Sequence, residues 1–146
     1  MTETDTTLLT GEDVSVGDTA PELVIEDIER VDFVKYAGAS GDFNPLHVDE
    51  TYATEAGYPT VFGHGMFTAG LASRLVVDWF GLDSIDRFRV RFTDQVWPGD
   101  TLTVTGEIVE CESAGEQVHV ECEFAVENQD SDVVLTGDST VTLPAE

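Results

Sequence analysis

Near the middle of the chain runs the apolar segment Met66-Phe-Thr-Ala-Gly-Leu-Ala-Ser-Arg-Leu-Val-Val-Asp-Trp-Phe80. Drawn as a helix it is hydrophobic on almost every side, which is typical of a helix buried inside a protein. A helix of about 15 residues is roughly 22 Å long and therefore too short to cross a bilayer. Gly81 is a natural end for this helix. Arg74 and Asp78 are four residues apart and could form an ion pair where one side of the helix reaches the surface.

The chain after this segment alternates apolar and polar residues with a period of two, which predicts strands. The predicted strands lie near residues 86–97, 101–111, 117–127 and 132–143, and a weaker one lies near 18–26. Gly, Pro, Asn and Asp occupy the short connections, and short connections favour antiparallel neighbours. Phe88 and Val96 are expected on one face of the first of these strands. The pattern predicts an α+β fold in which a curved antiparallel sheet wraps around the buried helix.

The rest of the chain fits the same single domain. Shorter helices are predicted at 27–37 and 49–56, the second with Asp49 as its N-cap. Residues 1–14 are expected to form a short solvated tail and residues 15–146 the domain, a length that suffices for a sizeable core. The N-terminus has no signal-peptide pattern and no long apolar run follows, so the expected location is the cytoplasm.

Charge is the unusual feature of the composition. The chain has 30 acidic and 6 basic residues, for a formal net charge of −24. Such a chain should repel nucleic acid and anionic membranes, so neither is expected as a partner. Acidity can accompany disorder, but the apolar periodicity favours a folded protein. In about 1 M salt the Debye length is only about 3 Å, so we interpret the composition as salt adaptation.

The two cysteines, Cys111 and Cys122, are too few for a disulfide framework. A hairpin centred near Gly115 would place Cys111 opposite about position 119, so free buried thiols are expected. The chain has no Cys-x-x-Cys pair and only three histidines, so a zinc site is not indicated.

The chemistry-bearing stretch is Tyr36-Ala-Gly-Ala-Ser-Gly-Asp-Phe-Asn-Pro-Leu-His47, between two predicted helices. Pro45 fixes its own φ and Gly41 tolerates unusual backbone angles, so this loop can direct Asp42 and His47 towards one point. A carboxylate and an imidazole together can hold a water and move its protons. Two alternatives stay open. Asp42 could cap a turn beside a polar His47, or the pair could bind a metal if His64 supplied a third ligand.

A second cluster, Val61-Phe-Gly-His-Gly-Met-Phe67, immediately precedes the buried helix. Backbone N–H groups at a helix N-terminus are unpaired and favour negative charge, which suits an oxyanion site for a thioester carbonyl. Alternatively, Gly63 and Gly65 only ease a tight turn into the core.

Together the two clusters resemble the MaoC-like, or R-specific enoyl-CoA hydratase, family of hot-dog-fold proteins, over about residues 15–143. The family motif, an aromatic residue followed by small residues and Gly-Asp-x-Asn-Pro-x-His, is present as Tyr36, Gly41, Asp42, Asn44, Pro45, Leu46 and His47. The resemblance implies that Asp42 and His47 activate water, that Asn44 orients the loop, and that the Gly65 N–H stabilises an enolate-like oxygen. The implied reaction is reversible syn addition of water to a trans-2-enoyl-CoA, giving an R-3-hydroxyacyl-CoA, with no metal or redox cofactor.

The resemblance also implies a homodimer or larger homo-oligomer with acyl tunnels near the subunit interface. Coenzyme A carries phosphates, and Arg87, Arg89 and Arg91 alternate along one predicted strand and could bind them. The alternative is cross-strand pairing with acids such as Glu107 or Glu121. The remaining basic residues, Arg30, Lys35 and Arg74, are further candidates.

Other functions compatible with the motifs are hydration or dehydration of a branched or dicarboxylic acyl-CoA of the mesaconyl or methylmalyl type, non-catalytic binding of acyl thioesters, and thioester hydrolysis. A binding module has no need of both Asp42 and His47. A thioesterase would release a free thiol, whereas a hydratase would not.

We expect the fold to loosen in dilute buffer, because repulsion among 30 acidic residues is then unscreened. Circular dichroism and the melting temperature should both report a more stable protein in molar KCl than in dilute buffer. Identical spectra and melting temperatures in the two conditions would contradict salt adaptation.

Overall fold

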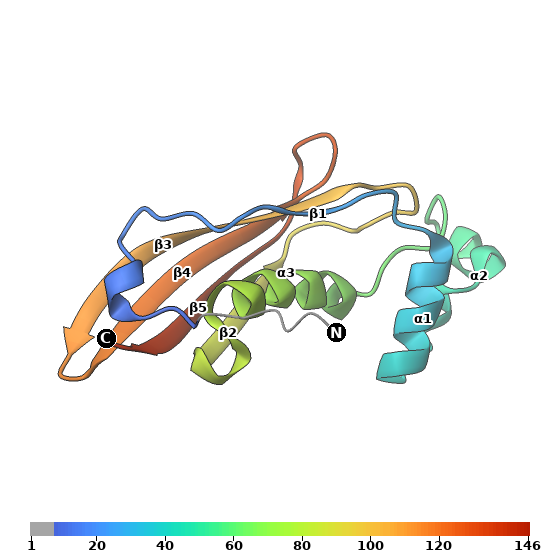
Figure 1. Ribbon diagram of the computed structural model, residues 1–146. Helices are drawn as coiled ribbons and strands as arrows, with labels where there is room; N and C mark the ends of the chain where they lie inside the picture. The colour runs from blue at the N-terminus through green and yellow to red at the C-terminus, as the bar shows by residue number, and fades with distance from the viewer. Residues whose placement is uncertain (1–7) are drawn as a thin grey trace, which may run out of the picture.

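The computed structural model describes residues 8–146 (Figure 1). Its helices are α1 (Arg30–Ser40), α2 (Glu50–Glu55) and α3 (Gly65–Phe80), with short 3-10 turns at Gly11–Asp13, Pro45–His47 and Leu82–Ser84. Its strands are β1 (Leu23–Ile25), β2 (Ile85–Phe92), β3 (Leu102–Ala114), β4 (Gln117–Glu127) and β5 (Val133–Pro144). No helix within residues 8–146 is long and apolar enough to cross a membrane.

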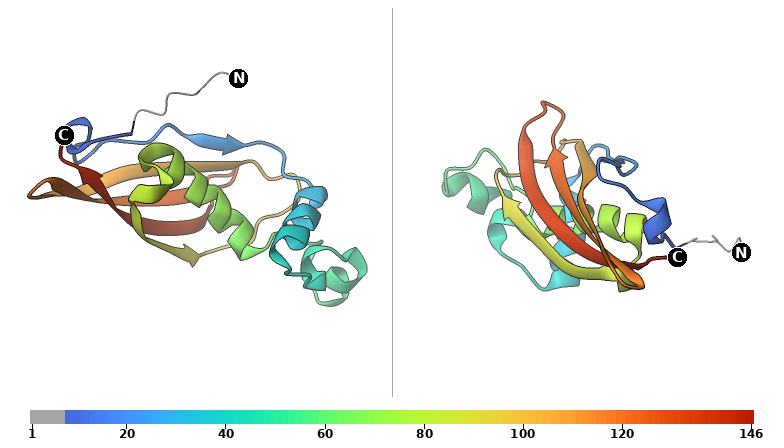
Figure 2. Two further views of the ribbon diagram at one scale, coloured as in Figure 1. Left: turned by 60° about the horizontal axis from the view of Figure 1, so that its bottom comes forward. Right: turned by 90° about the vertical axis from the view of Figure 1, so that its left-hand side faces the viewer.

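The five strands form one antiparallel sheet in the order β1-β3-β4-β5-β2. Helix α3 lies along one face of this sheet, which curves around it (Figures 1 and 2). Helices α1 and α2 sit beyond the N-terminal end of α3 (Figure 1). The predicted α+β architecture, a curved sheet wrapped around a central helix, is confirmed.

Helix α3 supplies the centre of the core. Ala72, Leu75, Val76 and Phe80 are at most 3% exposed and meet the apolar residues of the strands. An exposed stripe, formed by Met66, Gly70, Arg74 and Asp78, remains at a spacing of four residues. Met66 was expected inside but is 58% exposed. Among the ion pairs of the described residues, none joins Arg74 to Asp78.

Several element boundaries differ from those predicted. Strand β2 ends at Phe92 rather than 97, because the N–H groups of Thr93 and Asp94 both donate to the Val134 carbonyl and the chain then leaves the sheet. Val96 is therefore not on the strand, although it is only 3% exposed. The early strand shrinks to Leu23–Ile25.

Helix α1 begins three residues later than predicted. Asp27 has φ 49°, a left-handed conformation that a helix does not accommodate. The helix begins instead after Glu29, whose N–H donates to the Asp32 side chain at 2.8 Å. Helix α2 has the predicted cap, because Asp49 accepts a hydrogen bond from the Tyr52 N–H at 3.2 Å.

The expected N-terminal tail is only partly described. Residues 1–7 lie outside the described residues. Further along, Gly11 begins a 3-10 turn packed against Val118, and Val14 is 9% exposed, so this part of the expected tail packs onto the domain.

Both cysteines are free, as predicted, but only Cys122 is buried and Cys111 is half-buried. The β3–β4 register places Cys111 opposite Val120 and Cys122 opposite Ile108, so the two sulfurs belong to different cross-strand pairs. Cys122 faces the core and is 1% exposed.

Two glycines stand at close contacts of the sheet, Gly106 against α3 and Gly137 between strands. A Cβ at Gly106 would lie 2.9 Å from Leu75 and 3.3 Å from Trp79. A Cβ at Gly137 would collide with the Phe124 ring and the Arg89 carbonyl. The missing side chain at Gly106 therefore lets β3 lie close to α3, and the one at Gly137 makes room for the Phe124 ring and the neighbouring strand β2.

We predict that Gly137→Ala destabilises the protein by about 1–3 kcal/mol, because the methyl group overpacks the sheet against Phe124. Gly38→Ala is the matched control. It lies in the interior of α1 with no atom within 4 Å of the added Cβ, and should stabilise by about 0.4–1 kcal/mol. Urea unfolding in molar KCl measures both, and equal effects would contradict the proposed packing.

Candidate active site

The loop after α1 is shaped by its own polar groups. Gly41 ends α1 with φ 77°, and its N–H donates to the Ala37 carbonyl at 2.9 Å. Asn44 donates its N–H to Asp42 Oδ1 at 3.3 Å and accepts from the Leu46 N–H at 3.0 Å through its side chain. Asp42 thus caps a turn, as one alternative predicted, while its second carboxylate oxygen has no partner among the described residues.

His47 is held in one orientation. It is 9% exposed, and its Nδ1 lies 2.6 Å from the Phe62 carbonyl oxygen. A carbonyl only accepts, so Nδ1 carries the hydrogen and Nε2 carries a lone pair. The Phe62 ring also meets the imidazole edge-on, with ring centroids 5.2 Å apart. The fixed tautomer leaves Nε2 as the free, basic nitrogen.

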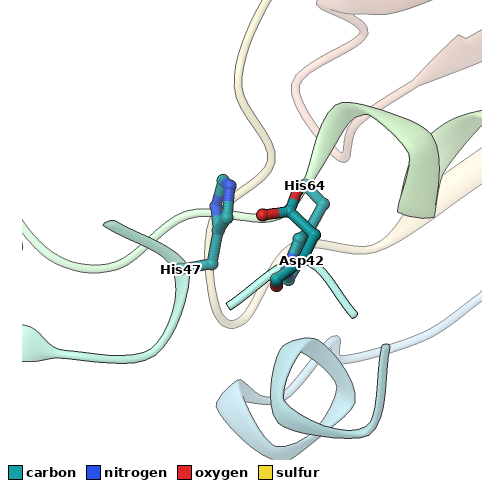
Figure 3. A group of neighbouring side chains, drawn as sticks. All are labelled: Asp42, His47 and His64. Carbon is teal, nitrogen blue, oxygen red and sulfur yellow. The ribbon is translucent and has the colours of Figure 1, made fainter. Parts of the chain in front are cut away.

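Three side chains converge at this place. Asp42, His47 and His64 each offer one oxygen or nitrogen, and these atoms all lie within 4.8 Å of one another. The Asp42 carboxylate points towards the His47 ring in Figure 3. Asp42 is exposed and both histidines are buried, so the cluster opens to solvent on the carboxylate side.

His64 takes part more directly than the sequence indicated. Its Nε2 lies 2.9 Å from the backbone oxygen of Asp42, so Nε2–H donates to that carbonyl. Its ring stacks on the ring of His47, with centroids 3.9 Å apart and planes at 29°. None of these contacts was predicted, because the residue pattern indicated His64 only as a third metal ligand.

The same stacking bears on the metal alternative. Imidazole lone pairs lie in the ring plane, and the planes of two stacked rings run side by side instead of meeting at one ion. A tetrahedral ion would require the His47 and His64 rings to turn out of their stacked arrangement, although the hydrogen bonds to carbonyl groups leave one nitrogen of each ring free. The arrangement therefore fits a proton-transfer pair better than a metal centre, and the absence of a metal stays a prediction.

The environment lowers the pKa of His47 below 6.5. Burial is the main cause, and a like charge on His64 acts in the same direction. The hydrogen bond to Phe62 and the negative charge of Asp42 oppose the shift. The imidazole is consequently uncharged near neutral pH, as a proton acceptor must be.

Gly65 begins α3 and is exposed. Its N–H has no acceptor among the described protein groups, as expected for the first turn of a helix. It borders a pocket of about 430 Å³ lined by Phe62, Gly63, His64, Gly65, Thr68, Phe92, Thr93, Asp94, Gln95, Val96 and Val134. Asp42 and His47 are not in this lining, but Phe62 and His64 line the pocket and contact His47, and His64 also contacts Asp42.

Two of the three arginines of β2 form ion pairs with a neighbouring strand. Arg87 and Arg89 pair with Asp138 at 3.3 and 3.0 Å on the exposed face of the sheet. Cross-strand pairing was one of the predicted alternatives, but the predicted partners Glu107 and Glu121 are wrong, because β5 and not β3 or β4 is the neighbour of β2. Arg91 is exposed opposite Thr136, and Arg30 pairs with Glu50 at 3.2 Å.

Comparison with known proteins identifies the class to which this fold and site belong. Residues 9–129 match the MaoC like domain. The chain is therefore a member of the MaoC-like dehydratase family, as its motifs predicted, and its wrapped-helix architecture is the hot-dog fold.

Individual relatives are similar to it along most of its length. The 3-hydroxybutyryl-CoA dehydratase of Methylorubrum extorquens is 31% identical over 136 residues, which cover 91% of this chain and 83% of the relative. The solved structure of the R-hydratase PhaJ1 from Pseudomonas aeruginosa is 28% identical, has a TM-score of 0.82, and is matched over 95% of this chain and 88% of its own.

Other relatives are much longer than this chain. Peroxisomal multifunctional enzyme type 2 of Mus musculus is 30% identical over 135 residues. The match covers 90% of this chain but only 17% of that enzyme. The chain spans 5% of fatty acid synthase subunit beta of Saccharomyces cerevisiae. The family includes hydratases and dehydratases of hydro-lyase type, while cytoplasmic location and homodimerisation stay predictions.

The free energy of unfolding should fall as the pH drops from 7.5 to 5.5. The folded-state pKa of His47 is lowered, so the unfolded chain binds a proton first, and the stability that His47 contributes above pH 6.5 is lost as the pH falls towards the folded-state pKa. His47→Gln should show a shallower decline, measured by urea unfolding in molar KCl. His119→Gln, an exposed control, should keep the wild-type slope, and equal slopes in all three proteins would refute the shift.

Proposed function

We propose that this protein is an R-specific enoyl-CoA hydratase, which adds water reversibly to a trans-2-enoyl-CoA. The observation that carries the proposal is that a carboxylate oxygen of Asp42 and a ring nitrogen of His47 lie within 4.8 Å of each other, while the hydrogen bond from Nδ1 to Phe62 leaves Nε2 of that ring with a free lone pair. The family supports hydro-lyase chemistry in general, and the pair supplies a place for the water.

In the proposed reaction, Asp42 and His47 hold one water between them. As the water oxygen bonds to the β-carbon, one of its protons passes to the pair, where Nε2 of His47 has a free lone pair. The electron pair of the double bond moves through the α-carbon towards the thioester oxygen. The pair then returns one proton to the α-carbon, so the net change is the addition of one water on one face.

The Gly65 N–H is the proposed donor to the thioester oxygen. It is exposed, has no acceptor within the described part of the chain, and stands at the positive end of the 16-residue helix α3. A donor fixed where charge develops lowers the barrier without reorganisation. The reaction transfers no electrons to another molecule, so it requires no redox cofactor, and the proposed steps use no metal ion.

The pocket beside Gly65 favours an uncharged acyl group. Its lining has no lysine or arginine and contains one acid, Asp94. A dicarboxylic acyl-CoA would bring a second carboxylate towards Asp94 without a cationic partner, which is unfavourable. This observation favours a simple enoyl-CoA over a mesaconyl-type substrate. Binding of CoA phosphates by Arg87, Arg89 or Arg91 stays a prediction.

We predict that the purified protein removes the conjugated enoyl absorbance of crotonyl-CoA in molar KCl. Asp42→Asn and His47→Gln should each lower kcat by about 10²–10⁴-fold, because each removes one member of the proton-transfer pair. Asp83→Asn and His119→Gln are matched controls at exposed sites outside the cluster and should keep wild-type rates.

The same assay separates the alternatives. A thiol reagent added in parallel would detect the free CoA that a thioesterase releases. Equal rates in wild type, Asp42→Asn and His47→Gln would remove the proposed roles. Binding of crotonyl-CoA without turnover would favour a binding module instead.

A further inference from the structure

His64 occupies the junction of the proposed site. It directly precedes Gly65 at the start of α3, and its side chain reaches back to the loop that carries Asp42. Its ring lies against the face of His47. Tyr36 closes the other side with its ring edge-on to His64, at a centroid distance of 4.8 Å. The His64 side chain thus contacts the backbone of Asp42 and the ring of His47. His64 also directly precedes Gly65, the proposed donor to the thioester oxygen.

The burial of His64 is not explained by its own hydrogen bonds. It is 2% exposed, and its Nδ1 is buried without a partner among the described residues. A buried polar atom without a partner opposes folding, so an apolar ring of similar size would serve packing alone at least as well. The polar edge that is satisfied, Nε2, is the one that donates to Asp42.

We propose that His64 is the positioning residue of this site: its Nε2–H fixes the Asp42 backbone and its ring face fixes the plane of His47, so that the carboxylate and the free Nε2 of His47 meet at one water. The inference rests on the hydratase function proposed above. His64 itself transfers no proton in this scheme.

Each member of the Asp42–His47 pair needs two constraints, because a single contact leaves it free to move in one direction. The hydrogen bond from His47 Nδ1–H to Phe62 fixes one point of the imidazole, but the ring can still tilt about that point. Stacking on His64 at 3.9 Å removes the tilt. Likewise, the turn through Asn44 fixes the Asp42 side chain to its own loop, whereas His64 fixes that loop to α3.

Two substitutions separate the two roles. His64→Gln keeps an N–H donor for the Asp42 carbonyl but loses the stacked ring, and His64→Phe keeps a stacked ring but loses the donor. We expect kcat for crotonyl-CoA to fall by about 100-fold in His64→Phe and by less in His64→Gln, with KM within about twofold, because displaced groups slow the reaction. His119→Gln, in the third histidine of the chain, is the matched control and should behave as wild type.

The pH dependence of kcat/KM provides a second test, because a merely structural role of His64 would leave the pH profile unchanged. The groups that act on the charge of His47 are Asp42 from its loop and His64 from α3. A positive charge on His64 lowers the pKa of His47, and His64→Gln abolishes this effect, so the pKa of His47 should rise. The acid limb of kcat/KM should therefore move to higher pH in His64→Gln. An unmoved limb together with wild-type kcat in His64→Phe would overturn the inference.

Imidazole NMR of the wild-type protein tests the geometry without any assay of activity. With only three histidines, and His119→Gln to remove one, the spectrum is readily assigned. We expect hydrogen on Nδ1 of His47 and on Nε2 of His64. The opposite tautomer at His64 would overturn the positioning role even if the protein is a hydratase. The expected tautomers with no turnover would instead refute the hydratase proposal alone.

Discussion

The packing of α3 against the concave face of the sheet is the constraint on which the rest of the structure depends. The sheet curves around the helix, and the missing side chain at Gly106 lets β3 lie close to Leu75 and Trp79 (Figure 2). That curvature leaves the N-terminal end of α3 at the edge of the sheet layer, where α1 and α2 gather (Figure 1). The loop between them can then meet the unpaired amides of the helix, which brings an acid, an imidazole and a donor together.

The residues of the site lie close together in the sequence, but contacts with more distant parts of the chain hold them in position. Asp42 and His47 share one short loop, and His64 and Gly65 follow within the next segment. The Gly63 N–H donates to the Val96 carbonyl at 2.8 Å, which anchors this segment to the chain leaving β2. Packing in the sheet therefore sets the position of a site whose reactive groups all lie outside it.

Periodicity and turn residues sufficed to predict the central helix, the four main strands and the Asp42–His47 loop, because each of these is encoded by a local pattern. Features set by partners distant in sequence were not predictable. Strand β2 stops where β5 begins, Asp138 pairs with the arginines because of the strand order, and His64 contacts a carbonyl 22 residues away. The left-handed Asp27 likewise shifted the start of α1; aspartate tolerates this conformation, but the local pattern does not show which aspartate adopts it.

The state of the two cysteines matters for a protein proposed to handle conjugated thioesters, which are electrophiles that thiolates attack. Burial raises the pKa of Cys122 to about 11 and also raises that of Cys111. At neutral pH only roughly one Cys122 in 10⁴ is then ionised, and the thiolate is the reactive form. The fold thereby protects the buried sulfur of Cys122 from alkylation by the compound that the proposed site would hydrate.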